Sequence, residues 1–474
     1  MNARTLRRGL LGTLIAATVL ALVAGCGHDP AAPARVGYDA TKVAGLTVAD
    51  GPSGLREDVP PPPLTVDGFT GTPVDRLAAN AVADVEDYWR VEYPKIFGRQ
   101  FIPVDRHVSY DSDDAAASVC GESVAGMPNA FYTGDCKQGR LIAWDRGMIS
   151  MYARLGEETV PYILAHEYGH AIQDQARLVN NSTTTVVREQ QADCFAGVYL
   201  RSVAEGKSAR FTLNTADGLN RVVVAAMSLR DGYYIGTMPS EHGSGFDRAS
   251  ALELGITDGA DACSRIDDAE IAARRGNLPA IFSSTETGEQ EITQDSVQAQ
   301  IDFVTQLFKL KDKPKVEYTG AIRGCPDAHE TTPVSYCPST NTIGIDLPGL
   351  VKRGHKVDSL VPSGDFDAYA LVVSRVLLAV EKASGRSLSE QSTALHVACY
   401  TGVYTDALAR GEQPESALSQ GDVDEALTGL LRDGLVASNV DGLSVPSGFA
   451  RIEAYQLGLK QGRTACDNTY TDAS

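Results

Sequence analysis

Two histidines and a glutamate lie close together in the segment ILAHEYGHAIQDQ, residues 163–175. His166 and His170 are four residues apart, so on a helix both imidazoles project from one face and can bind one metal ion. Glu167 lies between them and can accept a proton from a water molecule held at that ion. The residue types therefore suit metal-assisted hydrolysis. The alternative is a surface helix that carries two unrelated histidines.

A zinc ion that performs hydrolysis needs a third protein ligand and one open position. The next helical segment offers Glu189 as this ligand, with Asp193 four residues later on the same face. Asp193 can accept a hydrogen bond from the outer nitrogen of a ligand histidine and fix its tautomer. The HExxH pattern followed by such a glutamate predicts a zinc site. The alternative for Glu189 is a solvent-facing side chain without a ligand role.

A further histidine, His242, lies in the Gly- and Ser-rich stretch MPSEHGSG, residues 238–245. Hydrolases stabilise the oxyanion of the tetrahedral intermediate with a hydrogen-bond donor placed near the reacting carbonyl. We expect His242 to supply this donor and so to act with Glu167 as a catalytic residue. The alternative is a loop histidine with no role in catalysis.

The N-terminal segment has the composition of an export signal. Three arginines precede an apolar run that ends at Val23-Ala24-Gly25-Cys26. This ending resembles the bacterial lipobox, so we expect residues 1–25 to be a signal peptide and Cys26 to be lipidated. A transmembrane anchor is the alternative, but the apolar run is short for one. Residues 26–70 include Pro60 to Pro63 and predict a Pro-rich tether.

Lipid on Cys26 would hold the protein at the extracytoplasmic face of a bacterial cell membrane. The remaining chain is long enough for two or more domains, since the full sequence has 474 residues. Its formal net charge of −19 argues against nucleic-acid binding, which needs a basic face.

Eight cysteines remain beside Cys26, and their spacing repeats. The first four are separated by 16, 58 and 69 residues, and the last four by 12, 62 and 67. An even number of cysteines in an exported chain predicts disulfides. The simplest pairing that works in both sets is Cys120 with Cys136, Cys194 with Cys263, Cys325 with Cys337, and Cys399 with Cys466.

The neighbours of the cysteines repeat as well, because QADCFAGVY, residues 191–199, corresponds to HVACYTGVY, residues 396–404. We therefore expect a tandem duplication of one α+β domain over residues 71–280 and 285–474, each near the usual domain size. In each copy a helix and two strands precede two longer helices. The expected helices are 73–92, 158–177, 186–205 and 294–308, and the expected strands are 106–111, 139–144, 316–319 and 342–345.

The second copy lacks the residues proposed for chemistry. Alignment on the shared tyrosines and cysteines places Val373, Ser374, Leu377, Ala394 and Ala398 at the positions of His166, Glu167, His170, Glu189 and Asp193. The framework cysteines are kept, so the comparison inside one chain supports both sets of roles. We expect one zinc ion, in the first domain only, and a metal-free pseudo-peptidase repeat that stabilises that domain, forms one wall of its cleft or binds a protein partner.

The motifs HEYGHAIQ and EQQADCFAG, together with the EHGS sequence before Arg248, resemble the bacterial neutral zinc metallopeptidase family of the YpfJ type, a branch of the glutamate-liganded zincins. A lipoprotein with such a domain also resembles the LpqM-type lipoprotein peptidases of mycobacteria. The resemblance implies a zincin-like fold and zinc ligands at His166, His170 and Glu189. It also implies that Glu167 is the general base and that Asp193 supports a ligand histidine.

These observations predict a membrane-anchored, extracytoplasmic zinc metalloendopeptidase that acts on a peptide or protein substrate. Two alternatives remain open. One is a non-catalytic envelope binding or scaffold lipoprotein with structural zinc, against which the base Glu167 argues. The other is a cell-wall amidase, since the same residues suit hydrolysis of any amide carbonyl.

Overall fold

The computed structural model describes residues 39–231, 242–279, 289–356, 360–413 and 418–471. The predicted signal peptide and Cys26 lie outside these residues. The chain from Gly37 onward forms one compact unit that includes both predicted copies, and its fold class is α+β. None of the described helices is both long and apolar enough to cross a membrane.

The first half contains a four-stranded sheet with strand order β4-β5-β9-β8. Strands β4, β5 and β9 are parallel, and the edge strand β8 runs antiparallel to β9. Strand β9 reads LIAWD and is buried along its whole length. The strands are β4 (Val66–Asp67), β5 (Arg106–Tyr110), β8 (Ala130–Thr133) and β9 (Leu141–Asp145), with a small hairpin of β6 (Ser118–Val119) and β7 (Glu122–Ser123).

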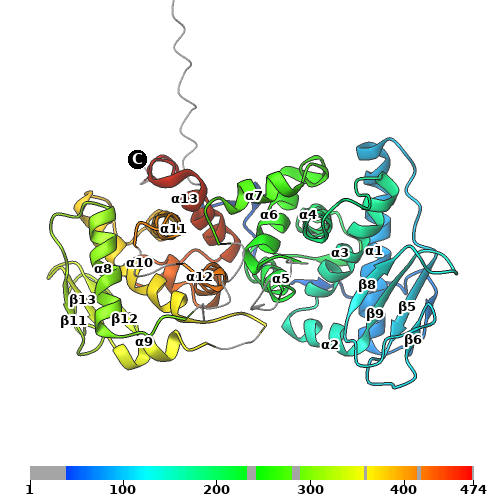
Figure 1. Ribbon diagram of the computed structural model, residues 1–474, viewed down its shortest axis with the longest axis horizontal. Helices are drawn as coiled ribbons and strands as arrows, with labels where there is room; N and C mark the ends of the chain where they lie inside the picture. Colours follow the sequence, from blue (N-terminus) through cyan, green and yellow to red (C-terminus); the bar gives the residue numbers. More distant parts are fainter. Residues whose placement is uncertain (1–38, 232–241, 280–288, 357–359, 414–417, 472–474) are drawn as a thin grey trace, which may run out of the picture. The chain divides into compact units, whose positions relative to one another are not determined.

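Seven helices accompany this sheet in the described residues, and the long α1 and α3 pack against each other beside it (Figure 1). The side chain of Thr72 caps α1 by accepting from the backbone N–H of Asp75, and Gly98 ends it in the left-handed region with φ 66°. The helices are α1 (Pro73–Phe97), α2 (Arg146–Leu155), α3 (Thr159–Ala176), α4 (Thr185–Ala204), α5 (Asp217–Ser228), α6 (Gly245–Ser264) and α7 (Asp268–Arg275).

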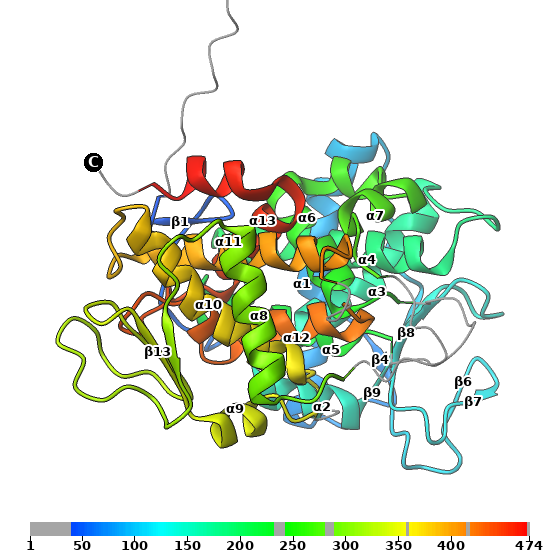
Figure 2. The same cartoon turned by 60° about the vertical axis from the view of Figure 1, so that its left-hand side comes forward.

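The second half contains a three-stranded sheet with order β11-β13-β12, in which β11 is parallel and β12 antiparallel to β13. Helix α8 lies against α10, as Figure 2 shows. The elements are α8 (Gln294–Leu307), β11 (Lys315–Glu317), β12 (Val334–Cys337), β13 (Thr342–Ile345), α9 (Leu347–Arg353), α10 (Asp365–Ala383), α11 (Gln391–Ala409), α12 (Gln420–Arg432), the 3-10 helix η2 (Leu435–Ala437) and α13 (Gly448–Thr469).

The two halves share an order of elements. Strands β5, β9 and β8 have the same order and directions as β11, β13 and β12, and each sheet is followed by four long helices. All four predicted cysteine pairs are disulfide-bonded. The Cys194–Cys263 bridge joins α4 to α6, and the Cys399–Cys466 bridge joins α11 to α13.

Glycines allow the disulfide-linked helices to cross at very short distance in both halves. A Cβ atom on Gly255 would lie 1.9 Å from the carbonyl oxygen of Cys194, and one on Gly458 would lie 1.8 Å from that of Cys399. We expect Gly255→Ala and Gly458→Ala each to destabilise the protein by about 1–3 kcal/mol or more, since the helices must move apart. Thermal unfolding measures this. Gly51→Ala, where a Cβ meets nothing within 4 Å, is the control, and equal melting temperatures for all three variants would contradict the prediction.

The segment before the first helix is not a free spacer where the structure describes it. Strand β3 (Gly54–Leu55) pairs with β10 (Phe211–Thr212), and β4 joins the first sheet. A further hairpin consists of β1 (Lys42–Val43) and β2 (Leu46–Thr47), and both Val43 and Leu46 are buried. The prediction of a tether over residues 26–70 is therefore wrong from residue 39 onward. Proline excludes helix, but it does not stop neighbouring apolar residues from entering a core.

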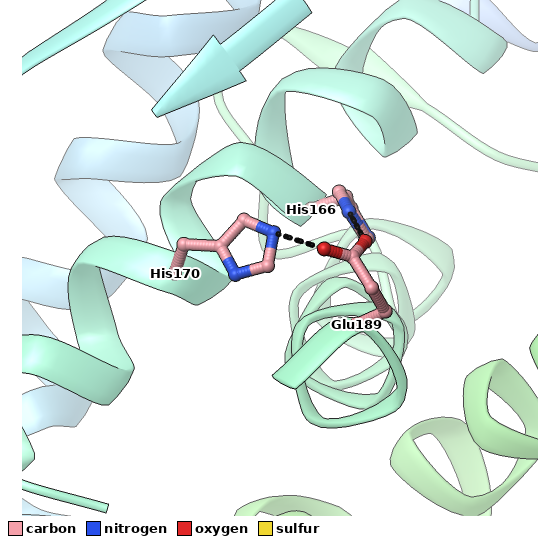
Figure 3. A group of neighbouring side chains, drawn as sticks. All are labelled: His166, His170 and Glu189. Atoms are coloured by element: carbon pink, nitrogen blue, oxygen red, sulfur yellow. Dashed lines mark hydrogen bonds and ion pairs between the residues drawn. The ribbon is translucent and has the colours of Figure 1, made fainter. Parts of the chain in front are cut away.

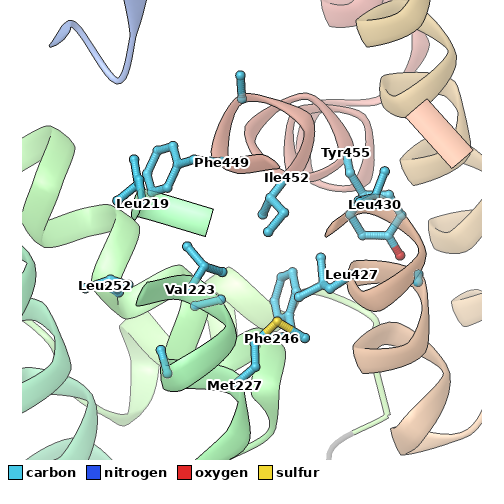
Figure 4. Packing of buried hydrophobic residues seen from close by; sticks show 14 of the residues in the cluster. Leu219, Val223, Met227, Phe246, Leu252, Leu427, Leu430, Phe449, Ile452 and Tyr455 are labelled. Carbon is cyan, nitrogen blue, oxygen red and sulfur yellow. The ribbon is translucent and has the colours of Figure 1, made fainter. Parts of the chain in front are cut away.

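The two halves meet along four helices. Helices α5 and α6 of the first half contact α12 and α13 of the second, and Figure 1 shows these helices between the two sheets. Buried apolar side chains fill much of the contact between the halves. For example, Phe246 of α6 lies close to Leu427 of α12 and Ile452 of α13 (Figure 4). Polar groups that are buried in this contact must find partners within the protein.

Candidate metal centre

The HExxH residues lie on α3 and face α4. A Cβ on Gly169, the glycine between Tyr168 and His170, would lie 2.6 Å from the Cα of Ala192 in α4. Only glycine permits this approach, which brings the side chains of α4 within reach of those of α3. Glycine at this position therefore matters for the site as well as for packing.

The structure brings His166, His170 and Glu189 together (Figure 3). The Nε2 atom of His166 is 3.1 Å from one carboxylate oxygen of Glu189, and the Nε2 atom of His170 is 3.5 Å from the other. All three ligand atoms lie within 4.8 Å of one another, and the three side chains are largely buried. Two imidazole nitrogens and one carboxylate are a donor set that zinc accepts with a position left open.

The outer nitrogens of both histidines have partners of their own. The Nδ1 atom of His166 is 2.8 Å from Asp193, and the Nδ1 atom of His170 is 3.0 Å from Gln173. These contacts orient both rings so that the Nε2 atoms converge. The contact between Asp193 and His166 is the one suggested from the sequence. Gln173 was not singled out, although its position three residues after His170 on one helix was a usable signal.

Asp193 is itself held by two further side chains. The hydroxyl of Tyr162 donates to it over 2.8 Å, and Nη2 of Arg248 donates over 2.9 Å. Both Asp193 and Arg248 are buried to at least 99%. Burial raises the pKa of Asp193, but the Arg248 charge, together with His166 and the Tyr162 hydrogen bond, outweighs this and holds the pKa below its usual range. Asp193 is thus a carboxylate that remains charged inside the protein.

The electrostatics of the three proposed ligands favour a positive charge among them. Burial lowers the pKa of His166, but the charge and hydrogen bond of Asp193, together with the hydrogen bond to Glu189, outweigh it and raise the pKa to about 10. Burial raises the pKa of Glu189, while the hydrogen bond from His166 and the charge of His170 lower it well below its usual range. At neutral pH this positive charge is a proton on His166. A metal ion at the same place would replace it, so metal binding is expected to release this proton.

Glu167 lies beside this group on the same helix. The backbone N–H of Tyr132, on the edge strand β8, donates to its carboxylate over 2.9 Å. Burial raises the pKa of Glu167 to about 7, which suits a residue that takes a proton and later gives it back. Glu167 contributes no atom to the ligand group formed by the other three side chains.

The ligand group and Glu167 open into one cavity of about 230 Å³. Phe131 and Tyr132 of β8 also line this cavity, as do Leu229 and His242. Strand β8 is at the edge of its sheet and so has a strand neighbour on one side only, which is the position from which an extended chain can be bound.

His242, which the sequence suggested as an oxyanion donor, lines this cavity. Its Nε2 atom is 3.9 Å from Glu189, and its Nδ1 atom is 3.0 Å from Asp231. The hydrogen bond to Asp231 raises the pKa of His242. The side chain is 44% exposed, so it can reach a bound molecule. No sequence motif identified Asp231, and residues 232–241 lie outside the described part of the chain.

The positions aligned with the proposed site are buried and mostly apolar in the second half. Arg451, which occupies the place of Arg248, donates to backbone carbonyls of Leu430 and Pro446 rather than to a carboxylate. His396 is buried beside Glu381 at 3.0 Å. The aligned residues are Val373, Ser374, Leu377, Ala394 and Ala398, all completely buried.

Two other groups of possible metal ligands occur among the described residues. One includes Cys325 and Cys337, whose sulfurs form a disulfide and are not thiolates. The other consists of Glu289, Asp365 and Glu425, with no histidine. Neither offers the nitrogen ligands and the neighbouring base that occur at His166.

The cluster of Glu289, Asp365 and Glu425 predicts an unusual pH dependence of the free energy of unfolding. Burial and the neighbouring carboxylates Asp422 and Asp365 raise the pKa of Glu425 to about 10. The folded state therefore keeps a proton that the unfolded state releases above about pH 4.5, so stability falls as pH rises from there. We expect Glu425→Gln to be more stable than wild type by about 1–3 kcal/mol at pH 8, with the difference vanishing near pH 4. Parallel curves of melting temperature against pH would contradict this.

Two imidazoles and a carboxylate on crossing helices, with a buried glutamate facing the same cavity, define a site of the zinc hydrolase class. In agreement, residues 36–234 match the model of a protein family described as "Putative neutral zinc metallopeptidase". This match supports zinc as the metal and peptide-bond hydrolysis as the reaction class. The matched range includes all three possible ligands and Glu167, but not His242 or Arg248. No curated protein and no solved structure matches the chain.

Proposed function

We propose that this protein is a zinc metalloendopeptidase whose single zinc ion is bound by His166, His170 and Glu189. The observation that carries the proposal is the convergence of two Nε2 atoms and one carboxylate at a cavity that also contains the buried Glu167. The family match over residues 36–234 supports the same reaction class.

The residues of the cavity have separate roles in peptide hydrolysis. Zinc, when bound, supplies a Lewis acid that acidifies water and polarises a carbonyl. Glu167, held by the backbone N–H of Tyr132, accepts a proton from the attacking water and donates it to the leaving amine. His242, oriented by Asp231, donates a hydrogen bond to the oxyanion. Strand β8 aligns an extended substrate along the cavity by backbone pairing.

We further propose that the protein is exported and held by lipid on Cys26 at the extracytoplasmic face of a bacterial membrane. The basic start, apolar run and lipobox-like ending of the sequence support this. The HEYGHAIQ and EQQADCFAG motifs support the proposal that the catalytic half is a peptidase of the YpfJ type and that the whole protein is similar to the LpqM-type lipoproteins.

We also propose that residues 285–474 arose by duplication of residues 71–280 and lost their metal site. The shared strand order, the paired disulfides and the matched glycine crossings support a common origin. Four apolar residues and one serine at the five aligned site positions support the loss of the metal.

The proposal is tested on residues 27–474, purified under oxidising conditions. Bound zinc is measured by atomic emission, and cleavage is measured with a mixed peptide library and, separately, with peptidoglycan fragments. We expect about one zinc per chain, cleavage of peptides, loss of both with a chelator and recovery with added zinc. Zinc without cleavage of either substrate class would contradict the peptidase assignment. Cleavage of peptidoglycan fragments alone would replace it with an amidase.

A further inference from the structure

Helix α6 begins at Gly245, three residues after His242, and carries Arg248 in its first turn. The backbone N–H groups of His242 and Gly243 both donate to Asp231 over 3.0 Å. Nη2 of Arg248 donates to Asp193, which in turn holds the Nδ1 atom of a proposed zinc ligand. The first turn of α6 therefore positions two side chains that face the candidate site.

This first turn is capped from the other half of the chain. Asp424, on α12, accepts hydrogen bonds from the backbone N–H groups of Gly245 and Phe246, both over 2.8 Å. Ser244 accepts from the N–H of Asp247, so three otherwise unpaired N–H groups at this helix end have acceptors. The negative charge of Asp424 also lies at the positive end of the helix dipole.

The contact is buried and close. Asp424 is 2% exposed, and a Cβ on Gly245 would lie 3.1 Å from its carboxylate carbon, so the glycine admits the carboxylate. Nε of Arg230 lies 3.9 Å from the same carboxylate. Phe246 extends from the capped turn into the apolar contact between the halves, which Figure 4 shows. With water excluded, hydrogen bonds to this carboxylate are strong and costly to lose.

A residue of the first half likewise caps a helix of the second half. Asn220, on α5 of the first half, accepts from the N–H of Gly448 at the start of α13 over 2.6 Å. Helix α13 carries Arg451 where α6 carries Arg248, but Arg451 contacts backbone carbonyls and no aspartate. Each half thus caps a helix of the other, and only one of these helices leads to the candidate site.

We propose that Asp424 is a positioning residue for the zinc site, supplied by the half that has no ligands. It fixes the first turn of α6 and, through that turn, the place of His242 in the cavity and of Arg248 against Asp193. The second half is therefore a required part of the peptidase. This inference rests on the proposed function for its catalytic consequence, while its structural consequence can be measured without turnover.

The test compares Asp424→Ala, Asp424→Asn and Asn220→Ala in the full chain. We measure kcat and KM for a cleaved peptide, the zinc dissociation constant by competition with a chelating dye, melting temperature, and amide hydrogen exchange over residues 242–250 in the metal-free protein. We expect Asp424→Ala to lower kcat about 10- to 100-fold with little change in KM. We also expect it to weaken zinc binding several-fold and to speed exchange in this segment.

Asp424→Asn keeps an acceptor and is expected to recover part of each loss. Asn220→Ala breaks the matching cap, so we expect a similar fall in melting temperature with kcat, zinc binding and exchange over 242–250 unchanged within about twofold. Equal effects of Asp424→Ala and Asn220→Ala on kcat and zinc affinity would overturn the proposal, as would unchanged exchange in Asp424→Ala. If wild type cleaves no peptide, the proposed function fails, and zinc affinity and exchange still decide the role of Asp424.

Discussion

The Glu167→Gln variant is expected to bind about one zinc ion per chain, as wild type does, and to lose about 10²- to 10⁴-fold in kcat. Glu167 contributes no atom to the group formed by His166, His170 and Glu189, so the ligands are unchanged. The glutamine oxygen can still accept from the backbone N–H of Tyr132, which keeps the side chain in place. What is lost is a base whose pKa of about 7 allows it to take and return a proton near neutral pH.

The matched control for this experiment is Ser374→Ala, at the aligned position of the second half. Ser374 is fully buried; its hydroxyl donates to the backbone carbonyl of Leu371 and accepts from Nε of Arg375 over 3.2 Å. We expect this variant to keep both zinc and turnover. Zinc analysis and steady-state kinetics on the same preparations separate a lost base from a lost metal. Full activity in Glu167→Gln would remove Glu167 from the mechanism.

A second large effect is expected at Asp193, which joins the metal site to the protein core. In Asp193→Ala, Arg248 keeps its charge in a fully buried place without the carboxylate now 2.9 Å away. Breaking a buried ion pair on one side costs about 3–5 kcal/mol, so the melting temperature should fall by many degrees. His166 also loses the partner that orients its ring, which should weaken zinc binding about 10- to 100-fold.

The double variant Asp193→Ala with Arg248→Met separates these two consequences. Removal of both charges leaves no unpaired ion, so we expect most of the stability to return. Zinc binding should remain weak, because nothing fixes the Nδ1 side of His166. Unfolding curves and zinc titrations of the single and double variants measure both effects. A double variant as unstable as the single one would show that Arg248 is not the cause of the instability.

Because each half caps a helix of the other, we expect the two halves to depend on each other for stability. Asn220 and Asp424 each accept hydrogen bonds from backbone N–H groups of the opposite half. Asp424 is buried next to Phe246 in the apolar layer between the halves, whereas Asn220 is half-buried. An isolated first half would expose this layer and leave the start of α6 without its charged cap. A stable, zinc-binding fragment of residues 39–280 would therefore argue against the positioning role of the second half.

The sequence alone determined the local parts of this protein. The four-residue separation of His166 and His170 predicts a shared helix face, because the helix repeat is fixed by backbone geometry. The repeated cysteine spacing predicted all four disulfides, since one pairing had to satisfy both halves. Predicted helix and strand bounds agree with the structure to within a few residues for α3, α4, β5 and β13.

Contacts between segments far apart in the chain were decided only by the tertiary structure. Residues 39–70 were expected to be free, yet they pair with β5 and β10. Three contacts near the candidate site result from how the helices cross, and no sequence motif predicts them. They are Asp231 with His242, Arg248 with Asp193, and the cap of α6 by Asp424. The physical reason is that periodicity and residue spacing encode the local secondary structure of a segment and the face of it that is buried. Which buried carboxylate meets which helix end depends on packing of the whole chain.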